Sequence, residues 1–283
     1  MNVRPTEPTT EETAHRIDVD SMANVVGRRA GPAALGARTP ARRPTLRVAA
    51  VAALILTVGL GAISTVLFLA AFQFRLDWFA DPAQVVAGGT TSAALFKWAA
   101  LTDLFSFYLP TAVVALALWV ALKHRGPMLA TAALAGALGY VLVGGVGAAA
   151  LAMAGAPLMV DYAEPGADQA AIATTFATLI NVVFRAVWQL VDGILLSIWM
   201  VATGLLIWND HPGLGRLSLG LGVLLALGTG LNVLGLGLLR DISLGLVFIT
   251  WAGWSIWLAV LIWRRRPPFD ALDAPHPSSG GRS

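Results

Sequence analysis

The sequence predicts an all-α, polytopic membrane protein, a bundle of six transmembrane helices with an overlong fourth helix. Hydrophobic residues make up 57% of the chain and charged residues only 12%, whereas a soluble domain would carry about twice this share of charge. The apolar residues gather in runs of about 20 or more, the length at which a helix crosses a bilayer. Six runs fit: Val48–Phe74, Trp98–Leu122, Met128–Ala156, Ala186–Trp208, Leu217–Leu239 and Ile242–Trp263.

The chain divides into a tail of residues 1–46, a transmembrane domain of residues 47–266 and a second tail of residues 267–283. The first tail begins with an acidic stretch and becomes rich in arginine, without acids, after Asp20. Proline and glycine leave no regular period in either tail, so we expect both to be disordered and cytoplasmic. The arginines predict a topology signal attracted to anionic lipid headgroups; the alternative is a docking site for a cytoplasmic partner.

The first span is long enough to tilt, and a hydrophilic loop separates it from the second. Lys97 and Trp98 form an interfacial pair where the second span begins. This span contains Asp103 in an otherwise apolar run. Pro110 should kink the same helix and free a backbone carbonyl near Ser106.

The third span is dominated by alanine and glycine, whose spacing lets helix backbones approach closely. The loop after it is acidic and has no basic residue. From about Ala167 to Trp208 only Gly193 interrupts a helical pattern, and such a helix would be roughly 60 Å long, twice the hydrocarbon thickness. We therefore expect Ala170–Phe184 to project beyond the bilayer or to lie along its outer interface.

The fifth span follows a clear turn at Asn209–Gly213. Its glycines form two stripes on opposite sides, which predicts a helix clamped between two close neighbours. Arg240 and Asp241 are expected to form a minimal loop into the sixth span. The tryptophans inside that span favour packing, with an apolar pocket as the alternative. Arg264–Arg266 end the span.

The basic residues give the chain an orientation. One side carries the N-terminal tail, Lys123, Arg125, Arg216 and Arg264–Arg266. The other side carries only Arg75, Lys97 and Arg240, and it holds the acidic loop. The positive-inside rule makes the first side cytoplasmic. We therefore predict a multi-pass protein of the cytoplasmic membrane with both termini inside the cell.

Polar residues of three helices converge on one depth, the outer third of the membrane. On an α-helix Arg185, Gln189 and Asp192 share one face with Asn181. Asp103 of the second span and Asn232 of the fifth are expected at the same level. The candidate ligand-binding residues are therefore Asp103, Arg185, Gln189, Asp192 and Asn232.

Two interpretations of this level compete. Asp103 or Asp192 could pair with Arg185 or Lys97 and fix the order of helices in the bundle. Alternatively, the level is the floor of a cavity open to the outside, which binds a small polar or cationic ligand or relays protons.

Several kinds of site are excluded or lack support. The chain has no cysteine, which removes disulfides, thiolate metal sites and cysteine nucleophiles. The four histidines lie in tails or turns, so haem ligation within the membrane is not expected. The flanks of Asp103 and Asp192 lack the motifs of intramembrane aspartyl proteases, and no hydrolase or phosphate-loop motif occurs. We predict no catalytic residue, metal, cofactor or nucleic-acid partner.

The layout resembles an uncharacterised, domain-of-unknown-function family of bacterial six-helix integral membrane proteins. The resemblance covers about Arg47–Arg266. It rests on the long loop between the first two spans, the overlong fourth helix, and the tryptophan-rich approach from Trp199 to the turn sequence at Pro212–Gly220. The extended basic N-terminal tail departs from the family's compact start. The resemblance implies a bacterial cytoplasmic membrane, and it transfers no activity and no functional residue.

These observations predict a non-enzymatic membrane protein that binds or transports a small molecule or lipid through an outward-facing polar cavity. The alternative is a structural or regulatory protein that acts through its basic tail, with the intramembrane charges forming an ion pair. The expected partners are the lipid bilayer, anionic headgroups at the arginine-rich tail, and the small-molecule ligand.

Overall fold

The computed structural model describes residues 46–75 and 82–273, and every regular element within these ranges is helical. The predictions for the first tail, for the loop around Asp81 and for residues 274–283 lie outside the described residues. The α-helices are α1 (Leu46–Ala71), α2 (Pro82–Val85), α3 (Gly89–Asp103), α4 (Leu109–Leu122), α5 (Pro127–Ala150), α6 (Ala156–Tyr162), α7 (Gln169–Asn181), α8 (Asp192–Ile207), α9 (Pro212–Val233) and α10 (Gly237–Trp263). Short 3-10 helices occupy Val86–Gly88 and Phe269–Asp273.

Six continuous helices of the described chain are long and apolar enough to cross a membrane, which confirms the predicted fold class. They run over Leu46–Ala71, Ala83–Leu122, Pro127–Tyr162, Gln169–Ile207, Pro212–Val233 and Gly237–Trp263. The fourth is overlong, as expected, with 39 residues, but the second and third reach 40 and 36 residues as well. These two spans exceed their apolar runs because the polar residues that flank the runs continue the helix instead of ending it.

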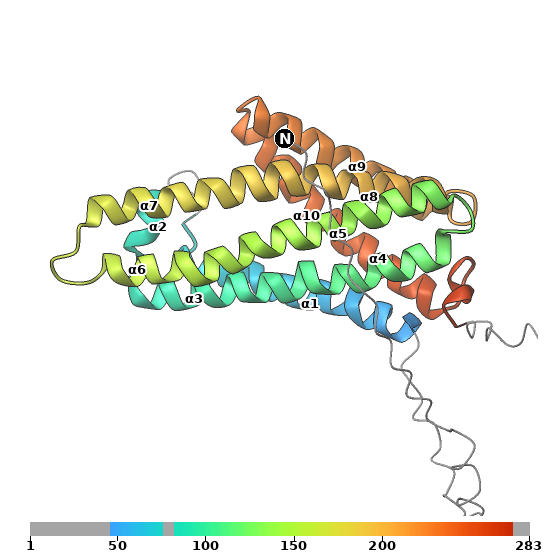
Figure 1. The fold of residues 1–283 in the computed structure, drawn as a ribbon, viewed down its shortest axis with the longest axis horizontal. Helices are drawn as coiled ribbons and strands as arrows, with labels where there is room; N and C mark the ends of the chain where they lie inside the picture. Colours follow the sequence, from blue (N-terminus) through green and yellow to red (C-terminus); the bar gives the residue numbers. More distant parts are fainter. Residues whose placement is uncertain (1–45, 76–81, 274–283) are drawn as a thin grey trace, which may run out of the picture. The chain divides into compact units, whose positions relative to one another are not determined.

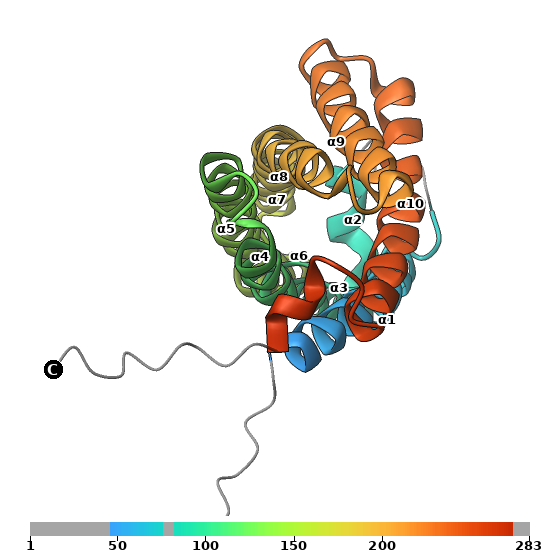
Figure 2. The ribbon, with the colours of Figure 1, turned by 90° about the vertical axis from the view of Figure 1, so that its right-hand side faces the viewer.

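The six spans pack as a closed ring of neighbours. The contacts run from α1 to α4, α5, α8, α9 and α10, and α10 returns to α1. Figure 2 views this ring along the bundle, and Figure 1 shows the same helices from the side. Where the ring closes, the Arg47 side chain donates to the Trp263 carbonyl at 3.3 Å.

Glycines set the distance between α9 and its two neighbours. A Cβ on Gly215 would lie 3.1 Å from the Gly204 carbonyl oxygen of α8. A Cβ on Gly228 would lie 3.0 Å from the Ser243 hydroxyl of α10. The predicted clamping of the fifth span is thus present, through glycines on two sides of the helix.

Three π-helical segments interrupt the long spans, at Leu104–Tyr108, Leu151–Gly155 and Val182–Val191. The first two end just before Pro110 and Pro157. Proline has no N–H and clashes with the carbonyl four residues earlier, and a wider turn relieves both problems. The predicted distortion at Pro110 therefore takes the form of a π-bulge, beside which the Ser106 hydroxyl donates to the Asp103 carbonyl at 3.1 Å.

The long second, third and fourth spans share a hydrophobic cluster of their own beyond the ring. Phe96, Met159 and Phe176 are fully buried there, among α2, α3, α6 and α7 (Figure 1). Helices of 36–40 residues are about 54–60 Å long, whereas the hydrocarbon core is about 30 Å thick, so part of each must lie outside it. The outer face of α7 carries Thr174 and Thr178, as expected of a segment outside the hydrocarbon.

The ends of α9 and α10 differ in two ways from expectation. The chain reverses at Leu234–Leu236, where Gly235 adopts a φ of 72° that other residues avoid, so Arg240 and Asp241 lie inside α10 instead of forming the loop. Beyond α10, Phe269 is buried and stacks on His211 with ring centroids 6.4 Å apart. The first residues of the predicted C-terminal tail are therefore packed against the bundle.

Three tryptophans fill the ring near its middle. Trp199, Trp251 and Trp254 lie with ring centroids 5.7–5.8 Å apart. Trp254 is fully buried and its indole N–H donates to the Ser218 hydroxyl at 2.8 Å. The packing interpretation of the interior tryptophans holds for this residue, whereas Trp251 also borders the cavity described next.

Candidate functional site

A cavity of about 260 Å³ lies inside the ring, and residues of all six spans line it. Its wall is mostly apolar and aromatic, with Phe68 of α1, Tyr140 of α5, Leu225 of α9 and other large side chains. Two carboxylates, Asp103 and Asp192, belong to the same wall. No lysine, arginine or histidine occurs among the described residues that line this cavity.

Asp103 is the last residue of α3, directly before the first π-helical segment. The Ser64 hydroxyl of α1 lies 3.4 Å from its Oδ1 and 3.1 Å from the Ala99 carbonyl, so one hydroxyl is shared between two acceptors. Ser64 is buried, and the contact joins the first and second spans. The carboxylate therefore keeps most of its capacity to accept hydrogen bonds.

Asp192 is the first residue of α8 and only 3% exposed. The Tyr108 hydroxyl donates to its Oδ2 at 3.4 Å, while Oδ1 has no hydrogen-bond partner among the described residues. The Tyr108 ring packs on Tyr140 with centroids 4.8 Å apart. Gly144 lies against both groups, since a Cβ there would overlap the Tyr108 ring and the Asp192 carboxylate. The Asp192 carboxylate is thus in contact with Tyr108 and Gly144 through Oδ2, while Oδ1 is left without a hydrogen bond in the described chain.

Two further polar atoms of the cavity wall lack a partner in the described chain. They are the Gln189 Oε1 and the Trp251 Nε1, and Trp251 is only 6% exposed. Buried polar groups are normally hydrogen-bonded, so an unsatisfied group calls for an explanation. The cavity is therefore bordered by two unpaired acceptors, the Asp192 Oδ1 and the Gln189 Oε1, and by one unpaired donor, the Trp251 Nε1, within the described chain.

The structure brings together three of the five predicted site residues. Asp103, Gln189 and Asp192 line the cavity. Arg185 is exposed, and neither Arg185 nor Asn232 lines the cavity; the Asn232 side-chain amide donates to the Arg185 backbone carbonyl at 3.1 Å. The physical reason is the π-helical segment Val182–Val191, in which residues four apart no longer lie above one another.

The ion-pair interpretation finds no counterpart in the described part of the chain. The ion pairs there join Arg125 to Asp210 and Arg240 to Asp241. Neither intramembrane carboxylate belongs to them. Lys97, the other predicted partner, is exposed and does not border the cavity.

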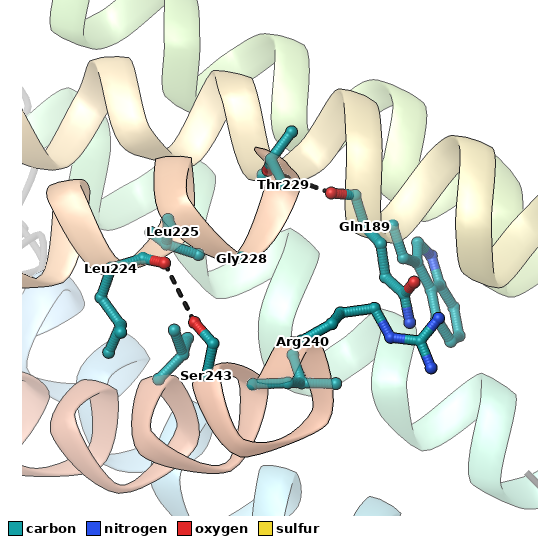
Figure 3. A pocket seen from close by; sticks show the side chains of 11 residues that line it. Gln189, Leu224, Leu225, Gly228, Thr229, Arg240 and Ser243 are labelled. Atoms are coloured by element: carbon teal, nitrogen blue, oxygen red, sulfur yellow. Dashed lines mark hydrogen bonds between the residues drawn. The ribbon is translucent and has the colours of Figure 1, made fainter. Parts of the chain in front are cut away.

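A smaller pocket of about 40 Å³ adjoins the cavity between α8, α9 and α10 (Figure 3). The two spaces share Gln189 and Leu244 among other residues. Figure 3 shows the Arg240 side chain extending from α10 toward Gln189. The Thr229 hydroxyl donates to the Gln189 carbonyl at 3.1 Å, and the Ser243 hydroxyl donates to the Leu224 carbonyl at 3.2 Å.

Sequence reasoning missed the two tyrosines of the cavity. Tyr108 follows Asp103 by five residues, which on an α-helix places it on a different face. A π-turn, with its five-residue hydrogen bond, brings the two to one side, and Pro110 was the available signal for such a turn. Tyr140 carried no signal, because it lies in a run of small and aliphatic residues that contains no charged residue.

The arrangement is suited to binding. Carboxylate oxygens accept hydrogen bonds and attract positive charge, and the aromatic wall can hold an apolar group or a cation. The described residues contain no group of three potential metal ligands. Comparisons of the chain with protein-family models, with curated proteins and with solved structures found no match. What is shown is therefore a multi-pass membrane protein with six candidate spans.

Proposed function

We propose that this protein binds an organic cation that has a primary ammonium group and an apolar body, in the cavity between its six spans. One observation carries the proposal: two carboxylates share an apolar cavity that no basic residue of the described chain borders. Ionisable residues within membrane spans are costly, and they commonly mark the path or site of a ligand.

The polar atoms of the cavity match an ammonium group. An ammonium carries three N–H donors, and the Asp192 Oδ1 and the Gln189 Oε1 are acceptors without a partner in the described chain. The volume of about 260 Å³ lies just below the roughly 300–1,000 Å³ range of drug-sized ligand pockets, which favours a small ligand.

The proposal includes an orientation. The basic ends of the spans, with Arg125, Arg216 and Arg264–Arg266, would face the cytoplasm by the positive-inside rule. The cavity would then be reached from the extracytoplasmic half of the membrane.

Thermal unfolding of the purified protein in detergent tests the proposal with three probes of equal chain length: hexylamine, hexanoate and hexanol. We expect hexylamine to raise the unfolding temperature, because only the amine is attracted by both carboxylates. Asp103→Asn and Asp192→Asn should each weaken the apparent affinity about tenfold or more, since a hydrogen bond to a charged group contributes roughly 1.5–3 kcal/mol.

Asp161→Asn is the matched control, because this exposed acid lies outside the cavity and should leave the hexylamine response unchanged. Equal shifts with hexylamine, hexanoate and hexanol would contradict the proposal. An unaltered hexylamine affinity in folded Asp103→Asn and Asp192→Asn variants would do the same.

A further inference from the structure

Between α1 and α10, away from the end where Arg47 and Trp263 close the ring, the wall of the cavity includes exposed residues. Three residues that line the cavity are also exposed on the surface: Thr65 of α1, and Leu244 and Phe248 of α10, with exposed fractions of 38% and 49% for the last two. Leu244 and Phe248 lie one helical turn apart and so face the same way. The cavity therefore reaches the surface beside the first half of α10.

The surface around this opening is apolar. Val66 follows Thr65 on α1, and Leu246 and Ile249 flank the exposed cavity residues on α10. All three are exposed, Ile249 to 74%. Because these side chains belong to membrane spans, their exposed surface faces lipid. An opening in this apolar surface would face the hydrocarbon of the bilayer.

We propose that the ligand is a single-chain amphiphilic amine drawn from the bilayer, whose ammonium lies at Asp103 and Asp192 while its alkyl chain leaves between α1 and α10. This inference rests on the proposed function and names the class of ligand. The aromatic ring of Phe107, beside the Asp103 end of the cavity, packs on Phe248 with centroids 6.1 Å apart, so the opening is bordered by aromatic groups that suit an alkyl chain.

The dependence of affinity on the length of the alkyl chain distinguishes an open cavity from a closed one. A closed space of about 260 Å³ would stop accepting longer chains once it is full. If the cavity opens into lipid, longer alkyl chains should continue to gain affinity, because each added methylene group is still transferred out of water. The gain is about fourfold in apparent aqueous affinity per methylene, which is the fold-change equivalent of about 0.8 kcal/mol.

The experiment measures the affinities of hexylamine, octylamine, decylamine and dodecylamine for the full-length protein in detergent by equilibrium dialysis, each referred to the free aqueous concentration of the amine. Subtracting the signal of the Asp103→Asn/Asp192→Asn variant removes non-specific partitioning. We expect the apparent affinity to rise through dodecylamine. An affinity that levels off or falls beyond hexylamine would overturn the inference while leaving the proposed function intact.

A second arm narrows the opening. Leu244→Trp places a larger side chain at a position that is exposed and therefore tolerant of size. We expect dodecylamine to lose about tenfold more affinity than hexylamine, because the long chain alone needs the opening. Ile249→Trp is the matched control on the same helix, and it should change neither affinity, since Ile249 does not border the cavity.

The outcomes of the two arms are distinguishable. If Leu244→Trp loses equal affinity for hexylamine and dodecylamine, or loses affinity for neither, the inferred opening between α1 and α10 is contradicted. If Leu244→Trp does not fold, the chain-length series in the parent protein decides alone. If no amine binds the parent protein, both the proposed function and the inference of an amphiphilic ligand are wrong.

Discussion

At the scale of single residues, the absence of a side chain at Gly144 makes room for the carboxylate of the cavity. The Tyr108 ring and the Asp192 carboxylate both lie where a Cβ on Gly144 would be. The Trp188 indole N–H also donates to the Gly144 carbonyl at 3.3 Å. One glycine therefore positions residues from the second and fourth spans, and it does so through its backbone and its small size.

Gly144→Ala should destabilise the protein by about 1–3 kcal/mol, because the added methyl group forces two packed side chains to move. It should also abolish the thermal response to hexylamine. Gly59→Ala is the matched control: Gly59 lies in α1, and a Cβ there would meet no atom within 4 Å. The control should gain about 0.5–1 kcal/mol from the better helix propensity of alanine. Comparable stabilities for the two variants would contradict the role of Gly144.

The residue scale also shows what sequence patterns could predict. Asp103 and Asp192 could be identified because charge within an apolar run is rare and must be sheltered, whatever the local geometry. Arg185 could not be assigned correctly, because its direction depends on the pitch of the helix around it. The hydrogen bond from Asn232 to a backbone carbonyl could not be predicted from the sequence either, since any residue could supply that carbonyl.

At the scale of elements, the π-helical segments decide which side chains face the cavity. The Leu109 N–H bonds to the Leu104 carbonyl, and the Asp192 N–H bonds to the Val187 carbonyl, both five residues back. Tyr108 and Gln189 lie within these wider turns. Two of the three π-helical segments thus border the cavity, in keeping with the frequent use of π-bulges at functional sites.

Pro110→Ala restores a backbone N–H that can bond to the Ser106 carbonyl and so favours an ordinary α-turn. We expect unchanged or higher thermal stability together with a weakened hexylamine response, because Tyr108 would rotate away from Asp192. Pro157→Ala makes the same change at the π-helical segment Leu151–Gly155, which does not border the cavity. It should leave hexylamine binding unchanged. Equal binding by both variants would show that the π-turn is not needed.

The boundaries of the elements were harder to predict than their number. Six apolar runs predict six spans because the bilayer thickness fixes the length of a crossing helix. The extra turns of the second and third spans escaped notice, because residues such as Thr90 and Asp161 are compatible with a helix as well as with a loop. The reversal at Gly235 was also missed, since glycine is frequent throughout the fifth span and does not single out a turn.

At the scale of the whole transmembrane unit, the three long spans extend the bundle past the ring, with a hydrophobic cluster of their own. The polar face of α7 belongs to this extension, and Asp168 caps the helix by accepting from the Ala171 N–H at 3.1 Å. In the orientation proposed above from the positive-inside rule, the extension would lie outside the cell. The connection between the third and fourth spans, which is acidic, would then be exposed to the extracytoplasmic medium.

Single cysteines test this arrangement, since the chain has none of its own. Thr178→Cys in α7 should react with a membrane-impermeant maleimide added to intact cells, because this exposed position lies beyond the hydrocarbon. Leu142→Cys in α5 is the control, because Leu142 is also exposed on the isolated protein, but in the membrane it would face lipid and should not react. Labelling of Thr178→Cys only after the cells are broken would reverse the proposed orientation.

The ring has a consequence for the biosynthesis of the protein. Its closing contact joins α1, the earliest of the six described spans along the chain, with α10, the last of them, as the pair Arg47 and Trp263 illustrates. Until α10 has been inserted, α1 has only one of its two lateral neighbours, and its other flank meets lipid. The carboxylates of the second and fourth spans are therefore inserted before the enclosure that shelters them is finished. A chain truncated after α8 would retain both acids but lack two of the six walls around them.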